Sequence, residues 1–187
     1  MKKLLLIGAR GSGKSTLGPV VADALGMPFV DLDALVLKRF SEPTVRQVWA
    51  VCGEQAWRAA EHEALNEALQ EQSGVIGLGG GTPMIPAARS LIDAQRAAGT
   101  ARCLYLQCDA GELARRLSQP GDDRPSLTGR DPAEEIAAVL AEREATYTAL
   151  ADATVEVTQL TLDEAGQAAV EAARRLLAAQ GPGGERP

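Results

Sequence analysis

One stretch near the start of the chain restricts what the rest of it can fold into. The apolar run Leu4–Ile7 leads directly into GARGSGKS at 8–15, which has the G-x-x-x-x-G-K-S spacing of a phosphate-binding loop. Apolar residues then recur at helical spacing over 17–25. Glycines let the backbone N–H groups of such a loop turn inward onto a phosphate. The sequence therefore predicts a strand, a loop and a helix that bind a nucleoside triphosphate; the alternative is an ordinary glycine-rich turn.

The polar residues of this loop predict how the triphosphate is held. Lys14 supplies a charge that can reach the β- and γ-phosphates, and the Ser15 hydroxyl is placed for Mg²⁺. The helix that begins there points the positive end of its dipole at the same anion. The predicted nucleotide-binding residues of the loop are Gly11, Ser12, Gly13, Lys14, Ser15 and Thr16.

Composition narrows the class of protein. The chain has 187 residues, 45% of them hydrophobic, which is enough for one domain with a sizeable core. Its net charge of −6 argues against nucleic acid as a partner, and no apolar run is long enough to span a membrane. We see no signal peptide, and the three cysteines lack metal-binding spacing. We therefore expect a cytoplasmic monomer with reduced thiols that binds neither nucleic acid nor membrane.

Strand and helix patterns alternate along the chain. Strands are expected at 3–7, 28–31, 75–78, 102–107 and 153–157. Helices are expected at 14–25, 33–40, 44–51, 54–72, 86–97, 110–117, 132–150 and 163–179. Strands separated by helices form a parallel sheet covered on both faces, so the predicted class is α/β with three layers. We expect one domain at 1–179, with a polar lid loop at about 117–131, and a flexible tail at 180–187.

Two acids stand at the end of the second expected strand. Ligands of an open parallel sheet bind outside this end of the strands, so Asp31 and Asp33 are expected near the phosphate-binding loop. One carboxylate can hold Mg²⁺ while the other accepts a proton from a substrate hydroxyl. No Asp ends the third expected strand, at 75–78, which makes Asp31 the better metal candidate. The alternative for Asp33 is that it only caps the helix that begins at Ala34.

Further candidates follow along the chain. On a helix, Glu54, Arg58 and Glu61 share one face. They are either a solvated ladder of ion pairs, or a guanidinium that Glu61 holds ready for a substrate carboxylate. The glycines at 79–81 follow the third strand and would let a ligand approach the backbone closely, unless they form a plain flexible turn.

Arginines can supply the remaining positive charge. Because the net charge of the chain is negative, the cations that meet a triphosphate must be gathered locally. The candidates are Arg115 and Arg116 before the lid, Arg124 within it and Arg143 after it. An arginine on a closing loop would neutralise transition-state charge and exclude water, although each of these residues taken alone is more often a surface residue.

Several motifs in one order give the chain a specific resemblance. They are GARGSGKST at 8–16, FVDLD at 29–33, GEQAWRAAE at 53–61, GGG at 79–81, DRPSLTG at 123–129 and AEREATY at 141–147. From about residue 3 to 160 the chain resembles the shikimate kinases, which use ATP to phosphorylate the 3-hydroxyl of shikimate on the route to chorismate and the aromatic amino acids. The resemblance implies a P-loop fold with a five-stranded parallel sheet of order 2-3-1-4-5, a substrate-binding segment at about 32–62, and a lid.

The resemblance implies roles for the nucleotide-binding candidates. Lys14 and Ser15 would hold the phosphates of ATP and Mg²⁺, and Asp31 would contact the metal through water. Arg124 would be the lid arginine on the phosphates, and Arg116 would pack on the adenine.

It also implies roles at the acceptor site. Asp33 would bind the hydroxyls of shikimate and act as the base, while Arg58 and Arg143 would hold its carboxylate. The backbone that lines the same pocket would be that of Gly79, Gly80 and Gly81.

The chain also departs from the family pattern. Residues 41–46 replace a Gly-x-[ST]-[IV] run, and Trp49 and Trp57 stand where phenylalanine is common. The lid is longer than in the shortest members. These differences bear on the fine structure of the pocket rather than on the reaction.

Two other functions compete with this interpretation. One is another small-molecule kinase with the same loop, such as a gluconate kinase, and the other is a nucleotide-binding module without activity. Arg58, the glycines at 79–81 and Arg143 favour shikimate over gluconate. The presence of Asp33 and Arg124 favours an enzyme.

Overall fold

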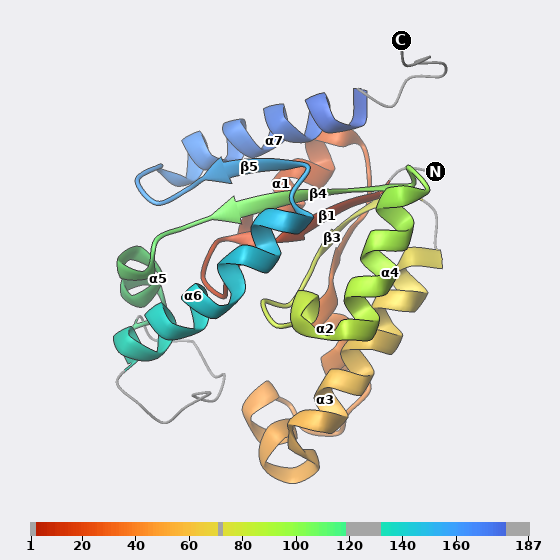
Figure 1. Ribbon diagram of the computed structural model, residues 1–187, viewed down its shortest axis with the longest axis vertical. Coiled ribbons are helices and arrows are strands. Elements are labelled where there is room, and N and C mark those ends of the chain that lie inside the picture. Colours follow the sequence, from red (N-terminus) through yellow and green to blue (C-terminus); the bar gives the residue numbers. More distant parts are fainter. Residues whose placement is uncertain (1–2, 71–72, 119–131, 179–187) are drawn as a thin grey trace.

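A parallel β-sheet forms the centre of the structure, a computed structural model that describes residues 3–70, 73–118 and 132–178 (Figure 1). The sheet has five strands in the order β2-β3-β1-β4-β5. The strands are β1 (Lys3–Ile7), β2 (Phe29–Asp31), β3 (Gly74–Gly77), β4 (Ala101–Gln107) and β5 (Ala153–Glu156). Every neighbouring pair is parallel. The predicted fold class and strand order are confirmed.

The helices lie close to the ranges expected from the hydrophobic pattern. They are α1 (Lys14–Leu25), α2 (Leu32–Leu37), α3 (Val45–Gln70), α4 (Pro86–Ala97), α5 (Ala110–Leu117), α6 (Pro132–Leu150) and α7 (Leu162–Ala178). A short 3₁₀ helix, η1 (Thr82–Met84), was not predicted; it forms where Pro83 follows the glycine run. The tail, and the part of the predicted lid beyond Ser118, lie outside the described residues.

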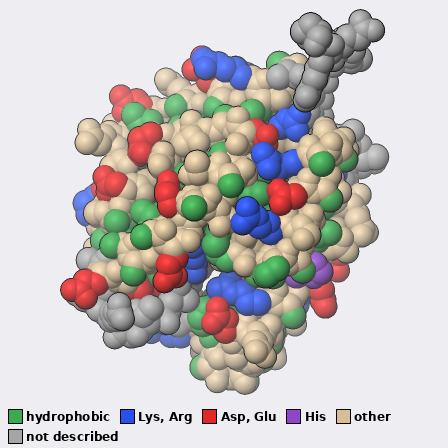
Figure 2. Space-filling view, in the orientation of Figure 1, with side chains coloured by type: hydrophobic (Ala, Val, Ile, Leu, Met, Phe, Trp, Pro, Cys, Tyr) green, Lys and Arg blue, Asp and Glu red, His purple; other side chains and the backbone are tan. Residues whose placement is uncertain are grey.

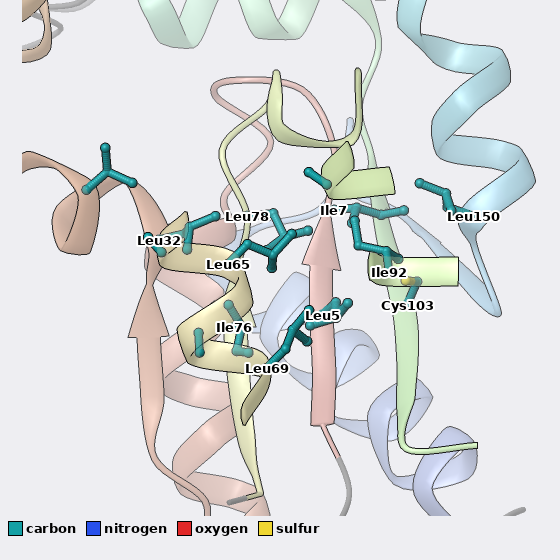
Figure 3. Close-up of a cluster of buried hydrophobic side chains, with 14 of the residues drawn as sticks. Leu5, Ile7, Leu32, Leu65, Leu69, Ile76, Leu78, Ile92, Cys103 and Leu150 are labelled. Atoms are coloured by element: carbon teal, nitrogen blue, oxygen red, sulfur yellow. The ribbon is translucent and has the colours of Figure 1, made fainter. Parts of the chain in front are cut away.

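Helices cover both faces of the sheet because alternate residues of β1 point to opposite sides. Leu5 and Ile7 pack with side chains of α2, α3, α4 and α6. Figure 3 shows this cluster, in which leucines of α3 and Ile92 of α4 lie around the same two residues. Leu4 and Leu6 pack on the other side, with side chains of α1, α5 and α7. The three predicted layers are therefore present, and none of the helices in the described part of the chain is both long and apolar enough to cross a membrane.

A break in α3 shapes the region around the site. Gly53 has φ 81° and ψ 162°, which are values outside the helical region that an L-residue adopts only under strain. The helix therefore has two parts, on either side of Gly53, as the sequence predicted for 44–51 and 54–72. The first part forms a projection at the bottom of Figure 1. In Figure 2, Lys and Arg side chains lie where this projection joins the body of the molecule.

Candidate active site

The loop between β1 and α1 is built to receive an anion. Its glycines have positive φ, and Gly13, with φ 100°, leads into the N-terminus of α1. The Lys14 ammonium donates to the carbonyl oxygens of Gly8 and Ala9, at 2.7 and 2.8 Å. The Ser12 hydroxyl is buried and has no hydrogen-bond partner within the described residues. A buried polar group without a partner costs free energy, which a phosphate oxygen bound in this loop would recover.

The next element supplies oxygen ligands of the kind that Mg²⁺ prefers. The Ser15 hydroxyl donates to Oδ2 of Asp31 at 2.6 Å. Oδ1 of Asp31 accepts from the backbone N–H of Ala34 at 3.1 Å, so that Asp31 caps α2. The capping role that the sequence left open for Asp33 therefore belongs to Asp31. The described residues contain no cluster of three or more His, Cys, Asp or Glu that could hold a metal. A hydroxyl, one carboxylate and the phosphates of a nucleotide together fit Mg²⁺.

A cavity of about 650 Å³ lies over this loop. Its lining includes the predicted nucleotide-binding residues Gly11, Ser12, Gly13, Lys14, Ser15, Thr16, Asp31 and Arg116. Arg116 closes one end of it, donating to Glu112 at 2.7 Å and to the carbonyl oxygen of Gly11 at 3.3 Å. Hydrogen bonds from Arg115 and Arg116 lower the pKa of Glu112 to about 2. Glu112 is therefore charged at neutral pH, and it orients Arg116 beside the cavity.

A second cavity, of about 310 Å³, adjoins the first. The predicted acceptor-site residues all line it, namely Asp33, Arg58, Gly79, Gly80, Gly81 and Arg143. Val45 and Arg46, which belong to the segment 41–46 that departs from the family pattern, line it as well. Among the described residues, Asp33, Arg10 and Leu117 line both cavities. Asp33 therefore lies at the junction of the cavity over the phosphate-binding loop and a smaller cavity lined by four arginines, among them Arg58 and Arg143.

Arg58 is held in place from several directions. It donates to Glu61 at 2.6 Å and to Glu54 at 3.0 Å, and its guanidinium lies 5.5 Å from the centre of the Trp49 ring. The Glu61 side chain is only 1% exposed and also accepts from the Thr82 hydroxyl at 2.7 Å. This confirms that Glu61 holds the guanidinium, as the second interpretation of the sequence proposed, and excludes a purely solvated ladder.

Burial affects the two members of this ion pair in opposite senses. It raises the pKa of Glu61, and the neighbouring Arg58 lowers it only in part. Burial by itself lowers the pKa of Arg58, but the carboxylates of Glu61 and Glu54 outweigh this, so that the pKa is raised. The positive charge of Arg58 is therefore secured at the edge of the cavity.

Charged side chains lie so close to the backbone of Gly79 and Gly81 that a larger residue there would displace them. A Cβ placed on Gly79 would lie less than 3.0 Å from carboxylate oxygens of Asp33 and Glu61. A Cβ on Gly81 would lie less than 3.0 Å from the Arg58 guanidinium. The glycine run is therefore not a plain flexible turn; it leaves room for charged side chains that converge on its surface.

Some site residues could not be predicted, and one predicted residue cannot be placed. Arg124 lies outside the described residues, so its lid role stays a prediction. Arg10 occupies an unspecified position of the phosphate-binding loop, and its place beside both cavities carried no sequence signal. Trp49 stood out only as a departure from phenylalanine, and its contact with Arg58 depends on the break at Gly53.

Comparison with known proteins identifies the family. The family model for shikimate kinase matches residues 10–174. The chain belongs to the shikimate kinase family. A shikimate kinase from Chlorobium chlorochromatii is 42% identical over 161 residues, which cover 82% of this chain and 80% of that one. This membership places the chain with the shikimate kinases rather than with the gluconate kinases.

Solved shikimate kinase structures share the fold. The crystal structure of the shikimate kinase from Bacteroides thetaiotaomicron has a TM-score of 0.80 and 28% identity, and the match covers 95% of this chain and 98% of that one. The shikimate kinase from Acinetobacter baumannii, solved in complex with shikimate, has a TM-score of 0.79 and 24% identity, covering 96% and 92%. The shikimate kinase fold thus extends over nearly the whole chain.

Proposed function

We propose that this chain transfers the terminal phosphoryl group of ATP to the 3-hydroxyl of shikimate, giving shikimate 3-phosphate and ADP, with Asp33 as the base. The observation that carries the proposal is the position of Asp33. Asp33 lines both cavities. Lys14 and Ser15 line only the larger cavity, and Arg58 and Arg143 line only the smaller one. A donor in one cavity and an acceptor in the other would meet beside this carboxylate.

The smaller cavity suits the chemistry of shikimate, which has a carboxylate at one end and three hydroxyls. Arg58 and Arg143 offer planar guanidinium groups that can hold a carboxylate through paired hydrogen bonds. Asp33 offers a carboxylate acceptor for hydroxyls. The backbone at 79–81 forms a wall with no side chain in the way.

The larger cavity would hold the nucleotide. We propose that Lys14, Ser12 and the backbone of the loop bind the phosphates, and that Arg116 packs on the adenine. Ser15 and Asp31 would hold Mg²⁺, which neutralises phosphate charge when bound. Phosphoryl transfer needs positioning more than covalent chemistry, so the main task of these residues is to align donor and acceptor.

The transfer itself is a single displacement. An oxygen–phosphorus bond forms between the shikimate 3-oxygen and the γ-phosphorus, the bond between that phosphorus and the β–γ bridging oxygen breaks, and ADP leaves. The proton of the hydroxyl passes to the Asp33 carboxylate. Arg124, at the lid, is proposed to stabilise the charge on the transferring group.

The test compares acceptors directly. Purified protein with ATP and Mg²⁺ is supplied with shikimate, with gluconate or with no acceptor, and both ADP formation and the phosphorylated product are measured. We expect ADP only with shikimate, together with a phosphate ester on its 3-hydroxyl. Turnover with gluconate at an equal rate, or ADP formation that does not depend on an acceptor, would overturn the proposal.

A further inference from the structure

Tyr147 lies directly behind the acceptor cavity without lining it. It is on α6, one helical turn after Arg143, and its side chain is fully buried. Its hydroxyl donates to the carbonyl oxygen of Gly80 at 2.6 Å. One side chain therefore links α6 to the middle of the glycine run.

The same hydroxyl also lies near two arginines of the acceptor site. The guanidinium groups of Arg143 and Arg58 both lie close enough to influence the pKa of this hydroxyl. Burial raises the pKa of Tyr147 to about 12, and the two guanidinium groups oppose that rise. The phenol is therefore neutral at physiological pH and donates its proton to the Gly80 carbonyl oxygen.

The glycine run depends on such external anchors. Glycines have no side chains of their own to fix the backbone, and they lose the most conformational freedom on folding. Thr82, at the end of the run, is held by Glu61 of α3 at 2.7 Å. Tyr147 provides the corresponding anchor from α6. The wall of the cavity is thus held between two helices, each of which also carries one of the arginines.

We propose that Tyr147 is a positioning residue for the acceptor, because its hydroxyl fixes the Gly80 carbonyl to the helix that carries Arg143, and so sets the wall of the cavity relative to that guanidinium. The inference rests on the proposed function, in which that substrate is shikimate. Gly80, which Tyr147 anchors, lines only the acceptor cavity, so we expect the larger effect on the acceptor.

The chain provides a matched control. Tyr105 is the only other tyrosine, is equally buried, and its ring centre lies 5.3 Å from that of Tyr147. Its hydroxyl donates to Glu144 at 2.7 Å, and neither residue lines a cavity. Tyr105→Phe therefore removes a tyrosine hydroxyl and its hydrogen bond from the same cluster, but that bond is not made to the glycine run.

The kinetic experiment compares Tyr147→Phe with Tyr105→Phe and the wild type. We expect Tyr147→Phe to raise the KM for shikimate about three- to tenfold, the range that one net hydrogen bond supplies, with kcat and the KM for ATP changed less than about twofold. Tyr105→Phe should leave all three constants near wild type, although it should lower Tm at least as much as Tyr147→Phe because its hydrogen bond is to a carboxylate. Equal KM values for shikimate in the two variants would overturn the inference, as would an equal rise in the KM for ATP. If the wild type did not phosphorylate shikimate, the proposed function itself would fail.

A second measurement is made on the wild-type protein and does not need Tyr147→Phe to fold. Because there are two tyrosines, protein labelled with 3-fluorotyrosine gives two fluorine NMR signals, which Tyr105→Phe assigns. Saturating shikimate should shift the Tyr147 signal by more than the Tyr105 signal, and ADP alone should shift neither strongly. A Tyr147 signal that does not respond to shikimate would also overturn the inference.

Discussion

Replacing Glu61 by glutamine tests whether a buried carboxylate organises the acceptor site. In the wild type, Glu61 accepts from Arg58 at 2.6 Å and from Thr82 at 2.7 Å, and it is almost completely buried. Glutamine has a nearly identical shape but no charge, and it offers only one carbonyl acceptor for these two donors. Arg58 keeps its contact with the half-exposed Glu54, so the guanidinium would remain near the site but less firmly held.

The loss of stability expected for Glu61→Gln follows from the kind of hydrogen bond that it removes. A hydrogen bond to a charged group contributes about 1.5–3 kcal/mol to stability. For a protein of this size, each kcal/mol shifts Tm by about 2–4 °C, so Glu61→Gln should lower Tm by roughly 3–12 °C. The KM for shikimate should rise about tenfold, which corresponds to about 1.4 kcal/mol of lost binding, while the KM for ATP stays near wild type.

Glu63 on the same helix is the control. It pairs with Arg39 at 3.1 Å, but its side chain is 68% exposed, and exposed pairs contribute at most about 1 kcal/mol. Glu63→Gln should therefore lower Tm by only a few degrees and leave the kinetic constants unchanged. The assays are thermal unfolding by circular dichroism and steady-state kinetics with each substrate varied. The reasoning would be refuted if the two variants had the same Tm, or if Glu61→Gln bound shikimate as well as the wild type.

Three further predictions concern separate parts of the molecule. Asp33→Asn should reduce kcat by about 10²–10⁴-fold without weakening ADP binding, as measured by calorimetry; unchanged turnover would remove Asp33 from the role of base. Gly79→Ala should lower kcat and also raise the KM for shikimate, because its methyl group displaces both Asp33 and Glu61, whereas Gly81→Ala should mainly raise the KM for shikimate through Arg58; an unchanged kcat in Gly79→Ala would contradict the close contacts described above. When native protein is treated with an aromatic disulfide reagent at pH 8, only the exposed Cys52 should react fast. Cys103 and Cys108 are both buried, and burial raises the pKa of Cys103 to about 12. Fast reaction of all three thiols before denaturation would disprove this.

The features that were predictable from sequence have local causes. The phosphate-binding loop is a contiguous motif, and its glycines, lysine and serine act through the backbone that they themselves form. The strands followed from apolar runs such as Leu4–Ile7, and the break in α3 followed from Gly53 between two apolar patterns. The approximate start of α2 was also predicted, but the identity of its cap was not. The helix begins at Leu32 rather than at Ala34, and this shift of two residues gives the capping role to Asp31 instead of Asp33.

The features that could not be predicted depend on contacts between distant segments. Tyr147 and Gly80 are 67 positions apart, and nothing in either local sequence indicates that they are bonded. The placement of Trp49 on Arg58 requires both the break in α3 and the packing of its second half on the sheet. Similarly, Arg10 lines both cavities, although it occupies an unspecified position of the phosphate-binding loop and its local sequence does not indicate this.

The central claim is that Arg58 and Arg143 bind the carboxylate of shikimate beside Asp33. The most direct test is a double-mutant cycle between the protein and its ligand, in which calorimetry measures the binding of shikimate and of its uncharged methyl ester to wild type and to Arg143→Ala. Because a charge-assisted pair contributes about 1.5–3 kcal/mol, the wild type should prefer shikimate over the ester by roughly 10- to 150-fold, and the variant should lose most of that preference. An equal preference in both proteins would show that Arg143 does not face the carboxylate.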